Sequence, residues 1–300
     1  MALELLDAPP IPGWLSQAYP FRRFGAKIDG RLVHFVDEGT GRPVLLVHGN
    51  PTWSFLWRKV IPGLPSHGLR VIVPDLIGLG LSEKLPSPGA HTAEMHVRSI
   101  LGLVAGLGLE NLVIVGQDWG GPIAAGVAAR EPERVTGAVF ANTAVLLPRT
   151  PIRTTWFHKL SHVPIVSEVL FRGLNFPVPI LYRVQGNPKS IGAFEKKAYH
   201  YPLRAWRDRA APLGLARMVP NHSNHPSMAL LSETDNWAHR FDGRTALVWG
   251  LRDPILGRAL RRMTEAFPHA HVTETQAGHF LQEEVPDEIT RAILSVTDGR

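Results

Sequence analysis

Short apolar runs that alternate with helical stretches constrain the fold of this chain more than any other feature. The runs have the length of buried strands, and the stretches between them carry apolar residues at helical spacing. The predicted strands are residues 31–36, 44–47, 70–73, 112–115 and 135–141, and the predicted helices are residues 54–60, 91–107 and 122–130. Strands that alternate with helices form a mostly parallel sheet with helices on both faces. We therefore expect an α/β fold.

The alternation is interrupted after residue 146. From 147 to 241 the sequence is rich in proline, aromatic and basic residues and contains no run typical of a buried strand, so we expect a helical segment there. The alternation then resumes with predicted strands at 245–249 and 271–275 and predicted helices at 255–267 and 287–295. We predict one core domain, residues 1–146 and 242–300, into which a helical cap, residues 147–241, is inserted.

Composition and length exclude several classes of protein. The chain has 300 residues and no cysteine, which excludes disulfides, thiolate metal ligands and thiol catalysis. Its formal charge of +6 comes with no nucleic-acid-binding motif, so we expect no nucleic-acid partner. The N-terminal residues lack the pattern of a signal peptide, and no stretch approaches the roughly 18 apolar residues of a membrane span. We expect a cytoplasmic protein without a membrane span; its oligomeric state stays open.

A glycine-rich turn, GQDWG at 116–120, joins a predicted strand to a predicted helix. Such a tight turn forces its central residue into a strained conformation, and glycine two positions to either side relieves the crowding. The turn would raise Asp118 above the carboxyl edge of the sheet, where open α/β sheets bind ligands. The alternative is an ordinary turn with a solvent-facing aspartate. Because strand, turn and helix are all present, we predict that Asp118 is a nucleophile.

An aspartate at the centre of this turn favours a particular reaction. A carboxylate that displaces a leaving group from a saturated carbon forms an ester, and water can cleave that ester at its carbonyl. A serine would instead form an ether, which water does not readily cleave. The sequence therefore predicts hydrolytic displacement of a leaving group from a saturated carbon.

Two further side chains would complete a catalytic triad. His279 follows the last predicted strand, and imidazole titrates near neutral pH, so it can take a proton from water. Asp253 follows the strand at 245–249 and would orient His279 and stabilise its charged form. The rival position after the strand at 135–141 holds Asn142, which carries no charge. The alternative roles are a helix cap ahead of Pro254 for Asp253 and a purely structural histidine at 279.

The turn HGNP at 48–51 follows another predicted strand and can supply hydrogen-bond donors. The backbone N–H groups of Asn50 and Trp119 would form an oxyanion hole for ester hydrolysis. The Asn50 amide and the Trp119 indole N–H are neutral donors, which suit a departing halide in a dry pocket. The alternatives are a simple turn residue at Asn50 and a core aromatic residue at Trp119.

These residues lie in five longer stretches: HGNPTWSFLWR at 48–58, PDLIGLGLS at 74–82, GQDWGGP at 116–122, WGLRD at 249–253 and AGHF at 277–280. Together the stretches resemble the haloalkane dehalogenases. The resemblance implies an α/β-hydrolase fold, with Asp118 as nucleophile, His279 as base, Asp253 as acid, and Asn50 and Trp119 as halide donors. It further implies hydrolysis of the carbon–halogen bond of a small apolar substrate to an alcohol, a halide ion and a proton, without cofactor or metal. The resemblance is weak in the predicted cap.

The same five residue types leave a second enzyme open. The β-lactone decarboxylases of bacterial olefin biosynthesis, which form an alkene and CO2, share them and are similar to this chain. The segment Asn142-Thr143-Ala144, followed by VLLPRTP at 145–151, is similar to those enzymes too. The motifs therefore predict the catalytic machinery better than the substrate.

Two other functions have less support. An epoxide hydrolase would need two cap tyrosines, for which Tyr182, Tyr199 and Tyr201 are candidates, but such enzymes usually carry an aromatic residue at the position of Asn50. A non-catalytic ligand binder would be expected to have lost a member of the triad, and none is lost.

Outside these motifs the signals are weaker. The aromatic residues Trp156, Phe157 and Phe176 are predicted to line an apolar pocket under the cap. Two pairs of histidines at close spacing suggest metal ligands, but without a carboxylate cluster they are more often surface residues. The pairs are His222 with His225 and His269 with His271.

Overall fold

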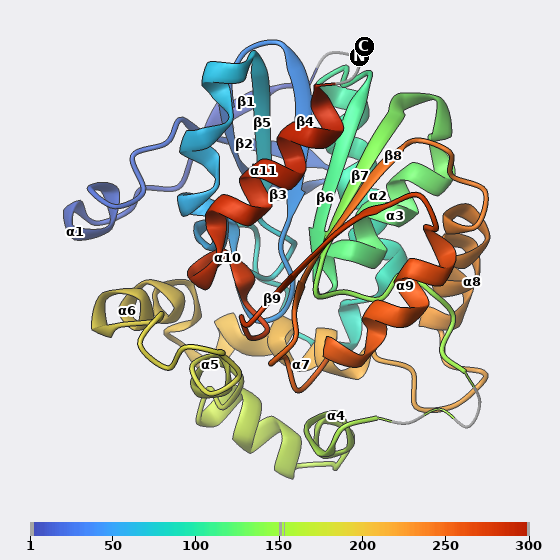
Figure 1. Cartoon of the computed structure of the whole chain (residues 1–300). Helices are drawn as coiled ribbons and strands as arrows, with labels where there is room; N and C mark the ends of the chain where they lie inside the picture. Colours follow the sequence, from blue (N-terminus) through green and yellow to red (C-terminus); the bar gives the residue numbers. More distant parts are fainter. Residues whose placement is uncertain (1–2, 150–151, 153, 299–300) are drawn as a thin grey trace.

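The computed structural model describes residues 3–149, 152 and 154–298, and Thr150 and Pro151 of the VLLPRTP segment lie outside this description. A nine-stranded sheet with the order β1-β2-β3-β5-β4-β6-β7-β8-β9 forms its centre (Figure 1). The strands are β1 Leu5–Asp7, β2 Arg23–Ile28, β3 Arg31–Gly39, β4 Arg42–Val47, β5 Leu69–Pro74, β6 Leu112–Gln117, β7 Val135–Ala141, β8 Arg244–Gly250 and β9 His271–Thr275.

The sheet is parallel from β5 to β9 and antiparallel at its N-terminal edge, where β1 pairs with β2, β2 with β3, and β3 with β5. The prediction of a mostly parallel sheet flanked by helices is confirmed. Strands β1 and β2 were not predicted. In β2, RFGAKI, a glycine and two basic residues dilute the apolar pattern, and only half of its residues are buried.

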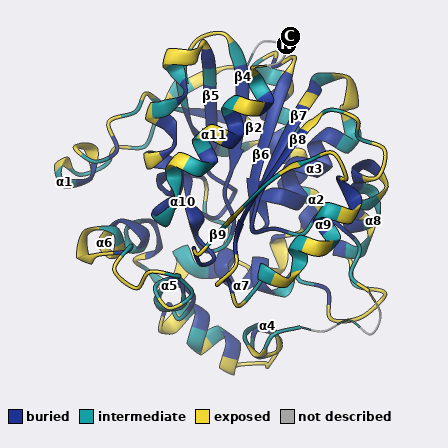
Figure 2. Cartoon of the chain, viewed as in Figure 1, coloured by how far each residue is buried: buried dark blue, intermediate teal, exposed yellow. Residues whose placement is uncertain are grey.

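Helices cover both faces of the sheet, which explains why β4 and β6 are almost entirely apolar and buried. Figure 1 shows α11 in front of the sheet and α2 and α3 behind it, and Figure 2 shows the buried strands between them. These helices are α2 Ala93–Gly106, α3 Gly120–Arg130 and α11 Pro286–Thr297. Thr92 is the N-cap of α2, because its Oγ1 accepts a hydrogen bond from the Met95 N–H at 3.1 Å.

The described residues between β7 and β8 form helices and no strand. They are α4 Trp156–Ser161, the π-helix η6 Glu168–Gly173, α5 Pro177–Leu181, α6 Ala193–His200, η7 Tyr201–Leu203, η8 Trp206–Arg209, α7 Ala210–Arg217 and α8 Ser227–Ala238. The segment from α4 to α7, named the helical insertion below, lies beyond one end of the sheet (Figure 1). Helix α8 instead packs against α3. The predicted end of the cap at residue 241 stays a prediction, and this packing argues for an end near residue 226.

Short elements complete the chain. They are α1 Gly13–Ser16, α9 Leu260–Ala266, α10 Leu281–Glu284 and the 3-10 helices η1 Ser54–Lys59, η2 Ile61–Gly63, η3 Pro65–His67, η4 Pro88–Ala90, η5 Pro132–Arg134 and η9 Gly257–Ala259. None of the helices in the described part of the chain has the length and apolarity needed to cross a membrane.

A buried ionic network joins the helical insertion to the core. Glu283, in α10, accepts hydrogen bonds from both Nη atoms of Arg58, at 2.6 and 2.9 Å, and from the Tyr199 hydroxyl of α6 at 2.5 Å. Burial alone would raise the pKa of Glu283, but Arg58 and Lys59 hold this pKa below its usual value. The carboxylate is therefore ionised and compensated, as a buried charge must be. Its contribution to stability is present above the unfolded-state pKa and is lost as the pH falls through the folded-state pKa.

The Tyr199→Phe variant should lower the free energy of unfolding by about 1.5–3 kcal/mol, because it removes a hydrogen bond to a buried charged group. Urea unfolding at neutral pH measures this loss. Tyr182→Phe is the matched control, since the Tyr182 hydroxyl makes only a 3.5 Å contact with the Lys196 carbonyl. Equal losses in the two variants would contradict a special role for the Tyr199–Glu283 contact.

Candidate active site

Asp118 lies at the end of β6 in a strained backbone conformation. Its φ is +52°, in the left-handed region that non-glycine residues rarely adopt. A Cβ atom on Gly116 would collide with Gly121, and one on Gly120 would collide with the Val47 carbonyl. Thr143 Oγ1 donates a 2.6 Å hydrogen bond to the Asp118 carbonyl, and the Asp118 N–H donates to the Asn142 carbonyl at 3.2 Å. Glycines and the end of β7 together hold the strained turn in place.

The turn that follows β4 contacts the Asp118 carboxylate directly. The Asn50 N–H donates to Asp118 Oδ1 at 2.7 Å, and a Cβ on Gly49 would collide with the same carboxylate. Burial alone would raise the pKa of Asp118, but His279, followed by the N–H groups of Asn50 and Trp119, holds this pKa below its usual value. The carboxylate is therefore ionised at neutral pH.

His48 anchors this turn. Its Nε2 accepts a hydrogen bond from the Leu76 N–H at 3.0 Å, so Nδ1 carries the proton and donates to the Gly49 carbonyl at 2.9 Å. Burial lowers the pKa of His48. A neutral imidazole is thus built into the backbone of the turn and fixes the position of the Asn50 N–H.

His279 lies between two carboxylates. Its Nδ1 is 2.8 Å from Asp253 Oδ2, and its Nε2 is 3.6 Å from Asp118 Oδ2. The side chains of His279 and Asp253 are buried, whereas that of Asp118 is 17% exposed and so can be reached by a substrate. Burial alone would lower the pKa of His279, but the charge of Asp253 and contacts with Asp118 raise it to about 10. The imidazole is therefore positively charged while Asp118 is ionised.

Asp253 is not the helix cap that its position before Pro254 suggested, because η9 begins only at Gly257 and its N-cap is Leu256. Asp253 Oδ1 instead accepts a hydrogen bond from the Ile255 N–H at 2.7 Å within the turn, while Oδ2 faces His279. The turn contact fixes the carboxylate and leaves one oxygen for the imidazole.

Asn142 has a different task from Asp253. Its Nδ2 donates to the Gly278 carbonyl at 3.0 Å, and its Oδ1 accepts from the Gly250 N–H at 2.8 Å. The amide needs both a donor and an acceptor for this pair of contacts, which a carboxylate could not supply. Asn142 thus joins the ends of β7 and β8 to the loop that carries His279.

Two residues beside the triad were missed from the sequence. Gln117 Nε2 donates to the His279 carbonyl at 3.1 Å and lies 3.3 Å from His279 Nε2, so it helps to position the imidazole. His158 of α4 lies near Asp118, and burial lowers its pKa to about 4, so it is neutral. The place of Gln117 just before Asp118 was a usable signal, whereas nothing in the sequence separates His158 from the other histidines.

Asn50 and Trp119 line a cavity of about 200 Å³ together with Asp118 and His279. The Asn50 Nδ2 donates one hydrogen bond to the Pro212 carbonyl of α7 at 3.0 Å. This bond orients the amide and leaves the second N–H of Nδ2 to donate to another acceptor. The Trp119 ring is buried beside the nucleophile. The two predicted donors are therefore brought to the same cavity as Asp118 and His279.

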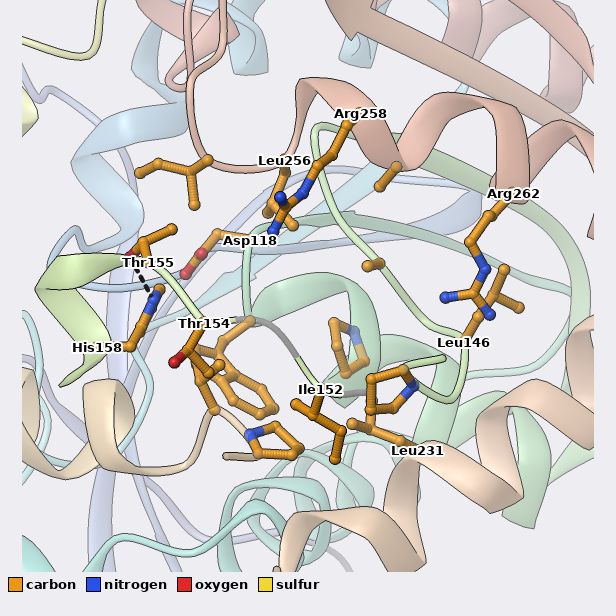
Figure 3. Close-up of a pocket in the computed structure, with 18 residues that line it drawn as sticks. Asp118, Leu146, Ile152, Thr154, Thr155, His158, Leu231, Leu256, Arg258 and Arg262 are labelled. Carbon is orange, nitrogen blue, oxygen red and sulfur yellow. Dashed lines mark hydrogen bonds between the residues drawn. The ribbon is translucent and has the colours of Figure 1, made fainter. Parts of the chain in front are cut away.

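A second cavity, of about 350 Å³, also reaches Asp118 and Trp119 (Figure 3). Both cavities are lined by Asp118, Trp119, Thr155, His158 and Ile255, so they meet at the nucleophile. Of the predicted aromatic lining, Trp156 and Phe157 line the smaller cavity. Phe176 lines neither and packs on Phe157 and Phe171, with ring centroids 6.2 Å away in each case.

The tyrosines required for an epoxide hydrolase are not beside the nucleophile. Within the described residues, no tyrosine lines either cavity at Asp118. Tyr199 is bonded to Glu283, Tyr182 contacts the Lys196 carbonyl, and Tyr201 packs on Trp14. This arrangement argues against epoxide protonation by this chain.

The histidine pairs do not form a metal centre. Both ring nitrogens of His225 are used by the backbone, with Nε2 3.0 Å from the Arg217 carbonyl and Nδ1 accepting from the Ser227 N–H at 3.2 Å. His269 and His271 are exposed. In the part of the chain that the structure describes, no group of three or more histidine or acidic side chains could hold a metal ion.

The sheet order, the strained turn after β6 and the loop carrying His279 define an enzyme of the α/β-hydrolase fold. Residues 42–165 match the α/β hydrolase fold family. Haloalkane dehalogenase DatA from Agrobacterium tumefaciens C58 has the same fold, with a TM-score of 0.82 at 25% sequence identity over 92% of this chain and 96% of that one.

Relatives of similar length identify the family within the α/β-hydrolase fold. Haloalkane dehalogenase 2 of Mycobacterium tuberculosis H37Rv is 35% identical over 294 residues, 96% of this chain and 98% of that protein. The cis-3-alkyl-4-alkyloxetan-2-one decarboxylase of Shewanella oneidensis MR-1 is 32% identical over 282 residues, 92% of this chain and 88% of that protein. The chain belongs to the haloalkane dehalogenase family, which confirms the resemblance recognised in its sequence.

Removal of the Asp118 charge should lower the pKa of His279, because this carboxylate is one of the groups that raise it. In Asp118→Asn the imidazole should therefore lose its proton at a lower pH than in the parent protein. NMR titration of the His279 ring nitrogens measures the change, after mass spectrometry has excluded deamidation back to aspartate. Asp287→Asn, which removes an exposed carboxylate of α11, is the control. An unchanged His279 pKa in Asp118→Asn would contradict the charge coupling.

Proposed function

We propose that this chain is a haloalkane dehalogenase that hydrolyses a carbon–halogen bond through an ester on Asp118. The observation that carries the proposal is the ionised carboxylate at the strained turn, faced by His279 and placed in one cavity with Asn50 and Trp119. Membership of the family and the 35% identity to a haloalkane dehalogenase support it.

In the first step, Asp118 Oδ attacks the halogen-bearing carbon in line, so a C–O bond forms as the C–halogen bond breaks. The electron pair of the broken bond leaves with the halide. The Asn50 amide and the Trp119 indole N–H hold this ion, and neutral donors allow its later release. The imidazolium of His279 lies on the side of Asp118 Oδ2.

In the second step, His279 activates water against the ester carbonyl. Esterification removes the negative charge of Asp118, one of the groups that raise the pKa of His279, so the imidazole can release its proton and become a base. The water oxygen adds to the carbonyl carbon, and the N–H groups of Asn50 and Trp119 stabilise the oxyanion. Collapse releases the alcohol and restores the carboxylate; the net products are alcohol, halide and a proton.

We further propose that the helical insertion caps the site. Thr155, Trp156 and Phe157, with Leu215 of α7, line the smaller cavity on that side. Apolar walls exclude water and strengthen the electrostatic interactions of the triad with the substrate.

A second candidate function is decarboxylation of a β-lactone to an alkene and CO2. One observation favours it: two cavities meet at Asp118, and a cis-3-alkyl-4-alkyloxetan-2-one, the substrate in the name of the Shewanella relative, carries two alkyl arms. The same Asp118 carboxylate would serve as nucleophile. Dehalogenation stays the first choice because a departing halide ion gives both Asn50 and Trp119 a role as hydrogen-bond donors.

His279→Phe should release a single equivalent of bromide from 1-bromohexane and then stop, because the ester forms but cannot be hydrolysed. Intact-protein mass spectrometry should find the mass of a hexyl group on the chain, located to Asp118 by peptide analysis. His239→Phe is the control, since the His239 ring contacts only the Asp235 carbonyl and its variant should turn over normally. Continued turnover by His279→Phe would contradict the role of His279 as base.

A parallel assay separates the two candidate functions. The purified protein is offered 1-bromohexane and a cis-dialkyl β-lactone, and bromide, alkene and CO2 are measured. We expect bromide and hexanol from the first substrate. Alkene and CO2 without any bromide would overturn the dehalogenase in favour of the decarboxylase.

A further inference from the structure

Two arginines line the larger cavity without a carboxylate partner within 4.0 Å among the residues that the structure describes. Arg258 of η9 and Arg262 of α9 come from the segment after β8, and Figure 3 shows both guanidinium groups turned toward the cavity that Asp118 also lines. They are at positions i and i+4 in the sequence, which places them on one face of the helical segment, one turn apart. Two like charges at this spacing destabilise a helix unless a negative charge compensates them.

The available hydrogen-bond partners do not compensate these charges. Arg258 is an exposed residue, and among the described residues it makes no hydrogen bond to a protein acceptor and has no carboxylate within 4.0 Å. Arg262 donates a single hydrogen bond, from Nη2 to the Leu147 carbonyl at 2.7 Å. The nearest acidic residue on α9, Glu265, is instead paired with Arg149 at 3.1 Å. Burial and then the charge of Arg149 lower the pKa of Arg262 and outweigh the opposing charges of Asp235 and Glu265.

The cavity between the arginines and Asp118 is apolar. Its walls include Leu146, Ile152, Leu231 and Leu256. Its volume of about 350 Å³ is within the range of small-molecule sites, roughly 300–1,000 Å³. A ligand that fits has an anionic end for the arginines, an apolar chain for the walls and a reactive carbon for the nucleophile.

We propose that Arg258 and Arg262 bind the carboxylate of the substrate, so that the preferred substrates are haloalkanes whose far end carries a carboxylate. The inference rests on the proposed dehalogenase activity. Guanidinium groups bind carboxylates through paired, charge-assisted hydrogen bonds. They also offset the repulsion between an anionic substrate and the ionised Asp118. Because Arg262 already holds the Leu147 carbonyl, Arg258 is the residue whose charge is free for the ligand.

The test compares 6-bromohexanoate with 1-bromohexane, which share the chain and the leaving group and differ in the carboxylate. We expect the parent protein to have the larger kcat/KM for 6-bromohexanoate. In Arg258→Gln, the ratio of kcat/KM for the two substrates should fall about tenfold, mainly through KM for the anionic one, because a charge-assisted hydrogen bond is lost. Arg261→Gln removes the same charge from the exposed side of α9, next to Glu265, and should leave the ratio unchanged.

A binding measurement separates this inference from the proposed function. Isothermal titration with hexanoate and with 1-hexanol requires no turnover. Hexanoate should bind more tightly than hexanol to the parent protein and to Arg261→Gln, and this preference should be lost in Arg258→Gln. If neither brominated substrate reacts, the proposed function fails. Hexanoate binding still tests whether the arginines bind a carboxylate. Bromide release with no preference for the anionic substrate, or equal hexanoate binding in all three proteins, would overturn the inference alone.

Discussion

The charge balance of His279 between two carboxylates is the interaction on which the site depends. A buried imidazole alone would be neutral, and two buried carboxylates alone would repel each other. Together the three groups form a compensated set in which Asp118 is ionised and accessible while His279 holds a proton. In the proposed reaction the same coupling changes the site, because an ester on Asp118 removes one negative charge. That single step would convert His279 from a stabilising cation into a base.

This balance requires that three strand ends be held close together. Neutral contacts do this work: Asn142 joins β7, β8 and the His279 loop, and His48 fixes the turn after β4. Charged contacts act farther from the site, where the Glu283 network joins the core to α6. The strained φ of Asp118 is tolerated because the surrounding hydrogen bonds determine the turn from both sides.

The sheet and the triad could be predicted from the sequence because both follow from local signals. Buried parallel strands have compact apolar runs, and parallel strand ends meet at one edge, so residues following them must converge. Antiparallel β1 was missed because it is a three-residue, partly exposed edge strand, and β2 was missed because a glycine and two basic residues interrupt its apolar pattern. Phe176 was predicted to line a pocket and packs in an aromatic cluster instead, since composition cannot tell which side of a short helix faces a cavity. His158 and Arg258 gave no signal, because their roles depend on contacts with segments far away in the chain.

The catalytic residues follow strand ends, whereas the other residues that line the cavities come mainly from other segments. This division explains how one set of catalytic residues could serve either of the two proposed reactions. The carboxylate, the imidazole and the neutral donors follow strand ends, and the same carboxylate is the nucleophile in both proposed reactions. What distinguishes substrates is the shape and charge of the space around Asp118, which comes from the helical insertion and from the segment after β8. Arg258 and Arg262 place positive charge in that space without touching the triad. Under the proposed substrate preference, residues of η9 and α9 select the substrate while the charge balance at His279 stays unchanged.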